Sequence, residues 1–352
     1  MVQLIMQNTA NNSFTPILLR WFSENKRDLP WRNTADAYAI WLSEVILQQT
    51  RIQQGRAYWE RFMERFPRVE NLAEATEDEV LRLWQGLGYY TRARNLHHAA
   101  RQIVANNGFP TTYDGIRKLK GVGDYTAAAV ASIAFGLPVA AIDGNVYRVL
   151  SRVFGIDTPI NSTEGKKTFA ALAQSLLPPA ASSAFNQALM DFGAMQCTPQ
   201  SPRCMQCPFT ESCEALRTGR TALLPVKRKT LKIQTRRMDY IYIRYNDFTA
   251  LRRRPKGDIW QGLWEPLLVE NGPMPALDGH LSLLRKQVKH VLTHRIILSD
   301  FYLLQTDARP LLPEDYVWVP EKEVENYALP RLIELLLEAV KTVIPNRLYN
   351  TE

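Results

Sequence analysis

Four cysteines, the only ones in the chain, lie within residues 197–213: Cys197, Cys204, Cys207 and Cys213. Their spacing is C-x6-C-x2-C-x5-C. Four thiolates in one short loop suit a tetrahedral metal site or a cubane iron–sulfur cluster. Unrelated thiols would not leave the rest of the chain without cysteine. Structural zinc sites usually have two C-x2-C pairs, and this loop has one. The spacing therefore favours a [4Fe–4S] cluster, with zinc as the alternative.

The composition is that of a folded protein with a basic surface. The 352 residues are 46% hydrophobic and 22% charged, which excludes wholesale disorder and fibrous repeats and predicts two or three domains. The formal net charge is +8 and the sequence pI is about 9.3. Such a balance favours a polyanionic partner, either nucleic acid or an anionic membrane surface.

No segment reads as a membrane span or a secretion signal. The longest nearly apolar run, residues 127–142, is interrupted by Ser132, Gly136 and Pro138 and is shorter than the roughly 18–20 apolar residues that a bilayer requires. The first fifteen residues lack a basic and then apolar signal pattern. We therefore expect a cytoplasmic protein, nucleoid-associated if bacterial, in which the cysteines are not disulfides.

Hydrophobic periodicity changes near residue 217. Before it the pattern is helical almost throughout, in these ranges: 38–66, 79–84, 95–105, 126–135, 146–154, 166–177 and 184–195. After a Lys/Arg-rich stretch come β-type segments at 239–245, 248–251, 296–304 and 316–319, and a final helix at 329–343. We expect an all-α domain over residues 1–216, a basic linker over 217–236, and an α+β domain over 237–346.

A glycine hairpin precedes one of these helices. Gly121 and Gly123 flank Val122, a pattern that allows a tight turn and close approach of another backbone. Free N–H groups at the following helix N-terminus suit a DNA phosphate. Asp143 stands at the start of the next helix, where it can be both an N-cap and a functional carboxylate. Alone, the G-x-G pattern also fits a plain helix-to-helix turn.

Together these segments resemble a known family. Leu119-Lys-Gly-Val-Gly-Asp-Tyr-Thr126, followed by Ala141-Ile-Asp143-Gly-Asn-Val146, resembles the helix–hairpin–helix DNA glycosylases. The cysteine loop resembles their iron–sulfur branch, which includes endonuclease III-type lyases and MutY-type adenine DNA glycosylases. The lyases carry a lysine nucleophile at the position of Tyr125, so the resemblance favours a monofunctional enzyme. Lys118 and Lys120 lie nearby and leave weak lyase activity open.

The segments around Arg32, Glu44 and Tyr89 resemble the MutY branch. Glu44 has the apolar helical neighbours Ile40, Trp41 and Leu47, so its carboxyl is expected to have a raised pKa and to donate a proton. The alternative is a solvated surface glutamate. The resemblance implies that Glu44 protonates adenine and that Asp143 stabilises the sugar cation.

The resemblance also assigns supporting roles. It implies that Tyr125 and Asn145 orient Asp143, that Arg32 and Asp191 contact the flipped base, and that Gln49 and Tyr89 wedge into the base stack. The DNA-contacting set is expected to be Arg32, Gln49, Thr50, Tyr89, Gly121, Gly123, Asp191, Thr293 and His294.

The C-terminal part resembles that family's Nudix-like domain, which reads 8-oxoguanine. Residues 266–290 contain only Glu270 and Asp278 as acids, too few for a working Nudix pyrophosphatase. The chain has Leu292-Thr293-His294 where the family usually has Phe-Ser-His. The fold class implied is a mainly α helix–hairpin–helix glycosylase fold with a [4Fe–4S] loop, plus an α+β Nudix-like domain.

The implied function is base-excision repair. The partner would be double-stranded DNA with A:8-oxoguanine or A:G mispairs, bound by a monomer without any membrane. The nearest alternative is an endonuclease III-type glycosylase and lyase acting on oxidised pyrimidines. A catalytically silent DNA-binding protein is an alternative of another class.

Overall fold

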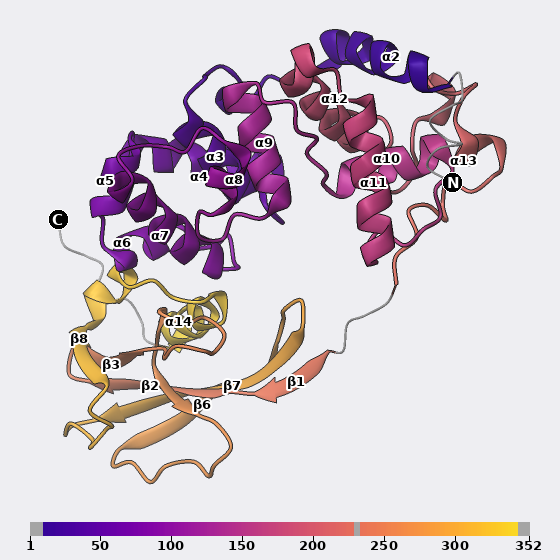
Figure 1. Cartoon of the computed structure of the whole chain (residues 1–352). Helices are drawn as coiled ribbons and strands as arrows, with labels where there is room; N and C mark the ends of the chain where they lie inside the picture. The colour runs from indigo at the N-terminus through magenta and orange to yellow at the C-terminus, as the bar shows by residue number, and fades with distance from the viewer. Residues whose placement is uncertain (1–9, 229–232, 344–352) are drawn as a thin grey trace. The chain divides into compact units, whose positions relative to one another are not determined.

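The computed structural model of the chain describes residues 10–228 and 233–343. Contacts divide it into two compact units (Figure 1). The first takes in the described parts of Met1–Ala73 and His98–Lys229, and the second those of Glu74–His97 and Thr230–Glu352. The units are therefore not simply consecutive stretches of chain.

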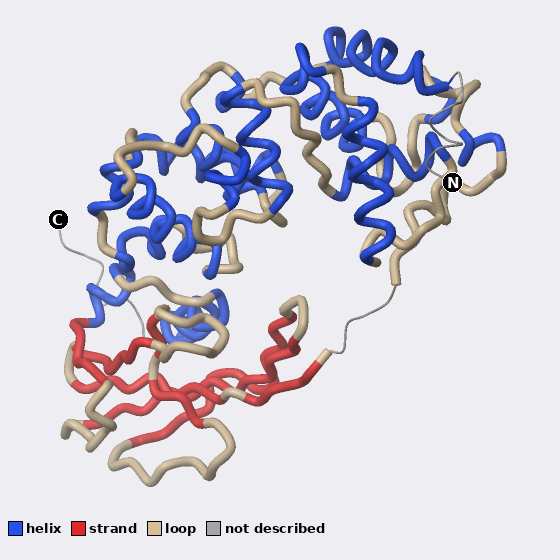
Figure 2. The backbone as a smooth tube through the Cα atoms, in the orientation of Figure 1, coloured by secondary structure: helices blue, strands red, loops and turns tan. Residues whose placement is uncertain are grey.

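Helices build the first unit (Figure 2). Its elements are α2 (Ala10–Asn25), η1 (Pro30–Arg32), α3 (Ala37–Leu47), α4 (Ile52–Arg65), α5 (Val69–Glu74), α8 (Tyr113–Arg117), α9 (Asp124–Phe135), α10 (Gly144–Phe154), α11 (Thr163–Leu176), η2 (Pro179–Ala181), α12 (Ser182–Met195), η3 (Cys204–Gln206) and α13 (Glu214–Arg217). α7 (Thr91–Ala105) begins in the second unit and ends in the first. Side chains of α2, α10, α11 and α12 form the main core of this unit.

The helix expected over residues 38–66 is two helices. α3 ends at Leu47, and Gln49 adopts a left-handed backbone with φ 58° before α4 begins at Ile52. α4 then packs against the end of α3. A Cβ on Gly55 would lie 2.6 Å from Leu47 Cδ2, so a larger residue at this position would require the Leu47 side chain to shift. The prediction of one continuous helix was wrong because the apolar residues of α4 follow those of α3 at the same helical spacing. That spacing does not reveal the polar turn between the two helices.

Local sequence sets the helices that flank the hairpin. α9 is rich in alanine and ends at Gly136, which has φ 66° and serves as a left-handed C-cap. α10 begins after Asp143, whose side chain accepts a hydrogen bond from Val146 N–H. Both ends agree with the expected ranges of 126–135 and 146–154 within two residues.

The second unit holds a mixed sheet with helices beside it. Its elements are α6 (Glu77–Leu83), β1 (Gln234–Arg237), β2 (Asp239–Tyr245), β3 (Phe248–Arg253), β4 (Trp264–Glu265), β5 (Leu267–Val269), β6 (His280–Val291), β7 (Arg295–Thr306), β8 (Tyr316–Pro320), η4 (Glu321–Asn326) and α14 (Arg331–Val343). The sheet order is β1-β7-β2-β3-β4; β5, β6 and β8 pair with β2, β7 and β3 respectively. β1 begins in the last part of the range expected to be a linker, 217–236, and ends one residue beyond it.

Strict alternation along β2 gives the sheet two cores. Tyr240 and Tyr242 join the cluster that packs against α14, while Ile241 and Ile243 join a second cluster on the opposite face. The predicted hairpin is present, because Tyr245 pairs with Phe248 around Asn246. β6, by contrast, was not predicted: it is largely exposed and its register shifts break the alternation.

The expected fold class is confirmed: a helical unit precedes a strand-rich C-terminal sheet with a closing helix. Within residues 10–228 and 233–343, helices that are both long and apolar enough to traverse a bilayer are not found.

Candidate active site

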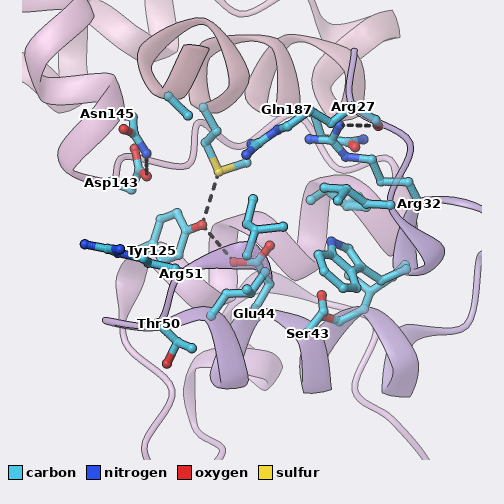
Figure 3. Close-up of a pocket in the computed structure, with 18 of the residues that line it drawn as sticks. Arg27, Arg32, Ser43, Glu44, Thr50, Arg51, Tyr125, Asp143, Asn145 and Gln187 are labelled. Atoms are coloured by element: carbon cyan, nitrogen blue, oxygen red, sulfur yellow. Dashed lines mark hydrogen bonds between the residues drawn. The ribbon is translucent and has the colours of Figure 1, made fainter. Parts of the chain in front are cut away.

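A cavity of about 530 Å³ opens between the helices of the first unit. Its walls come from η1, α3, the α3–α4 turn, α9, the start of α10, and α12 (Figure 3). Glu44, Tyr125, Asp143 and Asn145, which were predicted as catalytic, all line it, and so do Arg32 and Thr50. The fold thus brings these widely separated segments to one cavity.

Glu44 reaches the cavity from the last turn of α3. This helix is buried on most sides, with Trp41, Val45 and Ile46 in the core around the glutamate. Burial raises the pKa of the Glu44 carboxyl from its ordinary 4.5 to about 7. The hydrogen bond from Tyr125 opposes that rise, and the charge of Asp143 adds to it. A carboxyl with this pKa is a competent proton donor at neutral pH.

Asp143 faces the same cavity as the N-cap of α10. Its Oδ1 accepts from Val146 N–H at 2.8 Å, and its Oδ2 accepts from Asn145 Nδ2 at 2.7 Å. Burial raises its pKa above the ordinary value, and these two hydrogen bonds counteract that rise. Asn145 and the helix start therefore hold the Asp143 carboxylate by two hydrogen bonds.

Tyr125 was expected to orient Asp143, but its hydrogen bond to an acid is to Glu44. Its hydroxyl donates to Glu44 Oε2 at 2.8 Å and lies 3.1 Å from Met190 Sδ, while Asp143 is held by Asn145 (Figure 3). Burial raises the pKa of Tyr125 well above 10, which keeps the phenol a donor. The acid that the Tyr125 hydroxyl orients by a hydrogen bond is thus Glu44, whereas the resemblance implied that Tyr125 orients Asp143.

Asp191 stands behind the cavity wall. It is fully buried, and Arg32 donates to both of its oxygens at 2.8 Å, while Arg27 Nε donates at 2.9 Å. Burial alone would raise its pKa, but the two guanidinium groups hold the pKa below the ordinary value. Asp191 was expected to contact the base, yet only its partners Arg27 and Arg32 line the cavity.

Three further residues that were predicted to contact DNA, Gln49, Gly121 and Gly123, lie outside the cavity lining. Gln49 is exposed in the α3–α4 turn, in a left-handed conformation that is uncommon for this residue type. Gly121 has φ 77°, as the hairpin pattern predicts, whereas Gly123 has an extended backbone and caps α9. A Cβ on Gly123 would meet nothing within 4 Å, so the space beside the α9 N-terminus is open.

The four cysteines surround one small cavity of about 20 Å³ near α10 and α12. Arg152 donates to Cys197 Sγ at 3.4 Å, and Phe209 N–H donates to Cys207 Sγ at 3.4 Å. Burial raises the pKa of Cys207 to about 12. Four partly buried thiols would ionise beside bound metal ions, whose positive charge stabilises the thiolates. N–H groups that donate to cysteine sulfurs, like those of Arg152 and Phe209, are typical of iron–sulfur sites.

The four cysteines together fit an iron–sulfur cluster. Among the described residues, no three His, Cys, Asp or Glu side chains are grouped to hold one metal ion. All four cysteines nevertheless line the same cavity. Four cysteine thiolates are the donor set that holds a [4Fe–4S] cluster.

A buried arginine connects the cysteine loop with the acids. Arg148 donates from Nε to the Cys197 carbonyl at 2.7 Å and from Nη2 to Asn145 Oδ1 at 2.8 Å. Asn145 in turn donates to Asp143. The geometry of the carboxylate is therefore tied to the position of the loop.

The second unit has a cavity of its own, of about 500 Å³. Tyr89, Thr293 and His294, all predicted to contact DNA, line it together with Trp260. The Tyr89 and Thr293 hydroxyls are hydrogen-bonded to each other. Tyr89 is half exposed and has a left-handed backbone, with φ 49°. Non-glycine residues in that conformation cluster at functional sites.

Sequence reasoning missed several residues of the first cavity. Arg27, Trp31, Gln187 and Met190 line it without having been predicted. Gln187 stands one helical turn before Asp191 on α12, and this i, i+4 spacing was the available signal.

Family models match three parts of the chain. The model described as "HhH-GPD superfamily base excision DNA repair protein" matches residues 42–179. The model for the iron–sulfur binding domain of endonuclease III matches residues 197–213, and a NUDIX domain model matches residues 239–339.

The chain is also similar to solved DNA glycosylases. A thermostable thymine-DNA glycosylase is 30% identical, with a TM-score of 0.56, over 60% of this chain and 98% of that one. An endonuclease III–DNA covalent intermediate has a TM-score of 0.53 at 22% identity, over 62% of this chain and 98% of that one, which shows the shared fold.

Relatives named adenine DNA glycosylase are more similar in sequence. The mouse protein is 44% identical over 60% of this chain, and the human protein is 45% identical over 58%. The matches cover 44% and 39% of those proteins, so the chain spans less than half the length of these mammalian relatives. The protein of Buchnera aphidicola subsp. Schizaphis graminum is 32% identical over 93% of this chain and 99% of its own length. The chain therefore belongs to the adenine DNA glycosylase family.

Proposed function

We propose that this chain is a monofunctional DNA glycosylase that hydrolyses the N-glycosidic bond of adenine paired with 8-oxoguanine or guanine. It would act as a monomer on double-stranded DNA. One observation carries the proposal: Glu44 and Asp143 face a single cavity, and burial brings the pKa of Glu44 to about 7. One group can then donate a proton while the other carries negative charge. That the excised base is adenine is inferred from membership of the adenine DNA glycosylase family.

An adenine inside a duplex is out of reach, so it must leave the base stack. A cavity of about 530 Å³ falls within the roughly 300–1,000 Å³ typical of ligand pockets and can take a purine. Trp31 and Leu29 offer apolar surface to its faces, while Arg32 and Gln187 offer polar groups to its edges. Because Asp191 holds Arg32 by two hydrogen bonds, that guanidinium is fixed before the base arrives.

The chemistry divides between the two acids. Glu44 gives its proton to adenine N7, so the base departs as a neutral group. Asp143 stabilises the oxocarbenium-like sugar until water adds, the logic of two-carboxylate glycoside hydrolysis. Asn145 fixes Asp143, and Tyr125 orients Glu44. A positioned general acid contributes roughly 10²–10⁴-fold in rate.

The cavity favours hydrolysis over lyase chemistry. A lyase needs an amine nucleophile, and the described cavity wall includes no lysine. The position beside Thr126 is Tyr125, whose hydroxyl is engaged with Glu44. Borohydride trapping should therefore capture little covalent adduct.

The DNA contacts follow from the remaining site residues. The open space at Gly123 lets a phosphate approach the α9 N-terminus. The first N–H groups of a helix have no acceptor within the helix and can bind such an anion. The exposed side chains of Gln49 and Tyr89 can replace stacking that is lost when adenine leaves. The cluster, when bound, holds the cysteine loop and, through Arg148 and Asn145, supports Asp143.

We assign 8-oxoguanine reading to the second unit. Thr293 and His294 lie at the turn between β6 and β7, on the same cavity as Tyr89. The Thr293 hydroxyl can donate or accept toward the lesion. The family usually has a phenylalanine at the position of Leu292, so this chain lacks an aromatic group there. The Leu292 side chain packs against the core of the second unit.

The test is strand cleavage after alkali on three duplexes. We expect cleavage at A opposite 8-oxoguanine and at A opposite G, and none at thymine glycol. Cleavage of thymine glycol without alkali, with efficient borohydride trapping, would instead identify a lyase on oxidised pyrimidines. Binding without any cleavage would identify a silent DNA-binding protein.

A further inference from the structure

The strand β6 of the second unit is rich in Lys and Arg residues that have no role in the proposed excision of adenine. Residues 279–299, which include β6 and the turn after it, contain four Lys or Arg residues and no Asp or Glu. Arg295 lies 3.5 Å from Asp258 and is partly neutralised. The other three cations, Arg285, Lys286 and Lys289, fall within five consecutive residues of β6.

These three side chains are exposed and, among the residues that the structure describes, none forms an ion pair. Other cations of the same unit are mostly neutralised. Arg236 pairs with Asp258 and Glu270, and Arg254 pairs with Asp258 and the fully buried Glu265. Unpaired positive charge is thus concentrated on β6.

The irregularities of β6 keep this charge at the surface. Leu284, Val288 and Leu292 pack against the core beside α14. In an unbroken strand Lys286 would share their face, because side chains alternate with a period of two. Register shifts on both sides of Arg285 break the alternation, and Gln287 adopts φ 55° while its N–H donates to Asp300 at 2.6 Å. Lys286 is exposed as a result.

β6 also leads to the turn that carries Thr293 and His294. Leu292 N–H donates to the Arg295 carbonyl at 2.8 Å, which closes this turn. From residue 285 to residue 289 the strand extends at most about 13 Å at roughly 3.3 Å per residue. One DNA strand carries about four charges over that axial length, at 3.4 Å each. Three cations along β6 can therefore each meet a phosphate.

We propose that Arg285, Lys286 and Lys289 bind the DNA phosphate backbone next to the base approached by the β6–β7 turn. The proposal rests on the proposed function, since it takes DNA as the partner of the second unit. A peptide that adds to the sheet edge is the competing occupant, because β6 pairs with β7 alone among the described strands. The two register shifts and the lysines disfavour such pairing, whereas a run of cations without acids favours a polyanion.

Phosphate contacts have a signature that base contacts lack. Each one lowers the slope of log affinity against log salt by about 0.9 on duplex DNA, whatever the sequence. At 0.1 M salt, a protein that has one such contact more binds DNA about eight-fold more tightly, and this gain in affinity vanishes near 1 M salt.

The experiment measures Kd by fluorescence anisotropy between 0.05 and 0.4 M salt for R285Q, K286Q, K289Q and the triple variant. K322Q is the matched control: Lys322 is an exposed cation of the same unit, on η4, without an ion pair among the described residues. Two probes are used, an undamaged duplex and a duplex with G opposite 8-oxoguanine, neither of which contains a mispaired adenine to excise. Thermal unfolding checks that each variant folds.

We expect each β6 substitution to weaken both probes about eight-fold at 0.1 M salt and to make the negative slope shallower by about 0.9, and the triple variant to make it shallower by about 2.7. K322Q should change neither. Slopes equal to that of K322Q would overturn the proposal. So would a loss confined to the 8-oxoguanine probe, which would mean base reading. Because the undamaged duplex needs no excision, these results remain distinct from failure of the adenine chemistry.

Discussion

Replacing Glu44 by glutamine should abolish most activity and stabilise the protein at the same time. Glutamine has the shape of glutamate and still accepts the hydrogen bond from Tyr125, so the cavity is preserved. It has no acidic proton to give to adenine. We expect single-turnover excision to fall by about 10²–10⁴, or about 3–5 kcal/mol in the barrier, with little change in DNA affinity.

The stability change follows from the pKa. Folding raises the pKa of Glu44 from 4.5 to about 7, mainly through burial. The stability that this proton provides is fully present below about pH 4.5 and is lost as the pH rises through 7. At about 1.4 kcal/mol per pH unit, the buried carboxylate costs the native state about 3 kcal/mol at pH 8 and under about 1 kcal/mol at pH 5. E44Q removes that cost.

The assays are single-turnover excision on A:8-oxoguanine DNA and urea denaturation at pH 5 and pH 8. E64Q is the control, because Glu64 is exposed on α4 and its loss should alter neither measurement. In the wild type the excision rate should fall above about pH 7 as Glu44 ionises, and E44Q should lack that limb. Near-normal excision by E44Q, or equal stability of E44Q and wild type at pH 8, would refute the assignment.

Four more predictions concern the surrounding residues. D143N keeps an N-cap acceptor, so we expect normal folding and DNA binding with excision reduced at least about a hundredfold, measured by single-turnover kinetics and gel shift. Y125F removes the hydrogen bond that lowers the pKa of Glu44, so the alkaline limb of the pH–rate profile should move to higher pH. D191N leaves two guanidinium groups without their buried counter-ion and should destabilise folding by about 3 kcal/mol in urea denaturation. C204S should lower the iron content and visible absorbance and impair folding or DNA affinity, whereas unchanged absorbance would exclude Cys204 as a ligand.

Where local pattern fixes structure, sequence reasoning was accurate. The ends of α9 and α10 follow from Gly136 and Asp143, which act on the backbone within one turn. The β2–β3 hairpin follows from alternation and a two-residue turn. Prediction failed where an element depends on distant packing. β6 lacks alternation because its pairing with β7 shifts register on both sides of Arg285, and α3 and α4 are separated by the left-handed backbone of Gln49.

For the candidate site, residue types were predictable and partnerships were not. The resemblance predicted that Asp191 contacts the flipped base, but in the structure the Asp191 carboxylate accepts hydrogen bonds from Arg27 and Arg32. It pointed to Tyr125 beside Asp143, but the hydroxyl reaches Glu44. Helix spacing says which side chains share a face, and only the packing of α12 and α9 against their neighbours says which groups those faces meet.

The amino-acid sequence by itself determined the chemistry that this protein carries: an acid in an apolar helix, a carboxylate at a helix start, a glycine hairpin, and four thiols in one loop. Each depends on residues close together in the chain, whose dihedral preferences act locally. Tertiary structure alone decided that Glu44 and Asp143 share a cavity and that the pKa of Glu44 lies near 7. Desolvation comes from groups that are remote in sequence, and only the packed fold places them around the carboxyl.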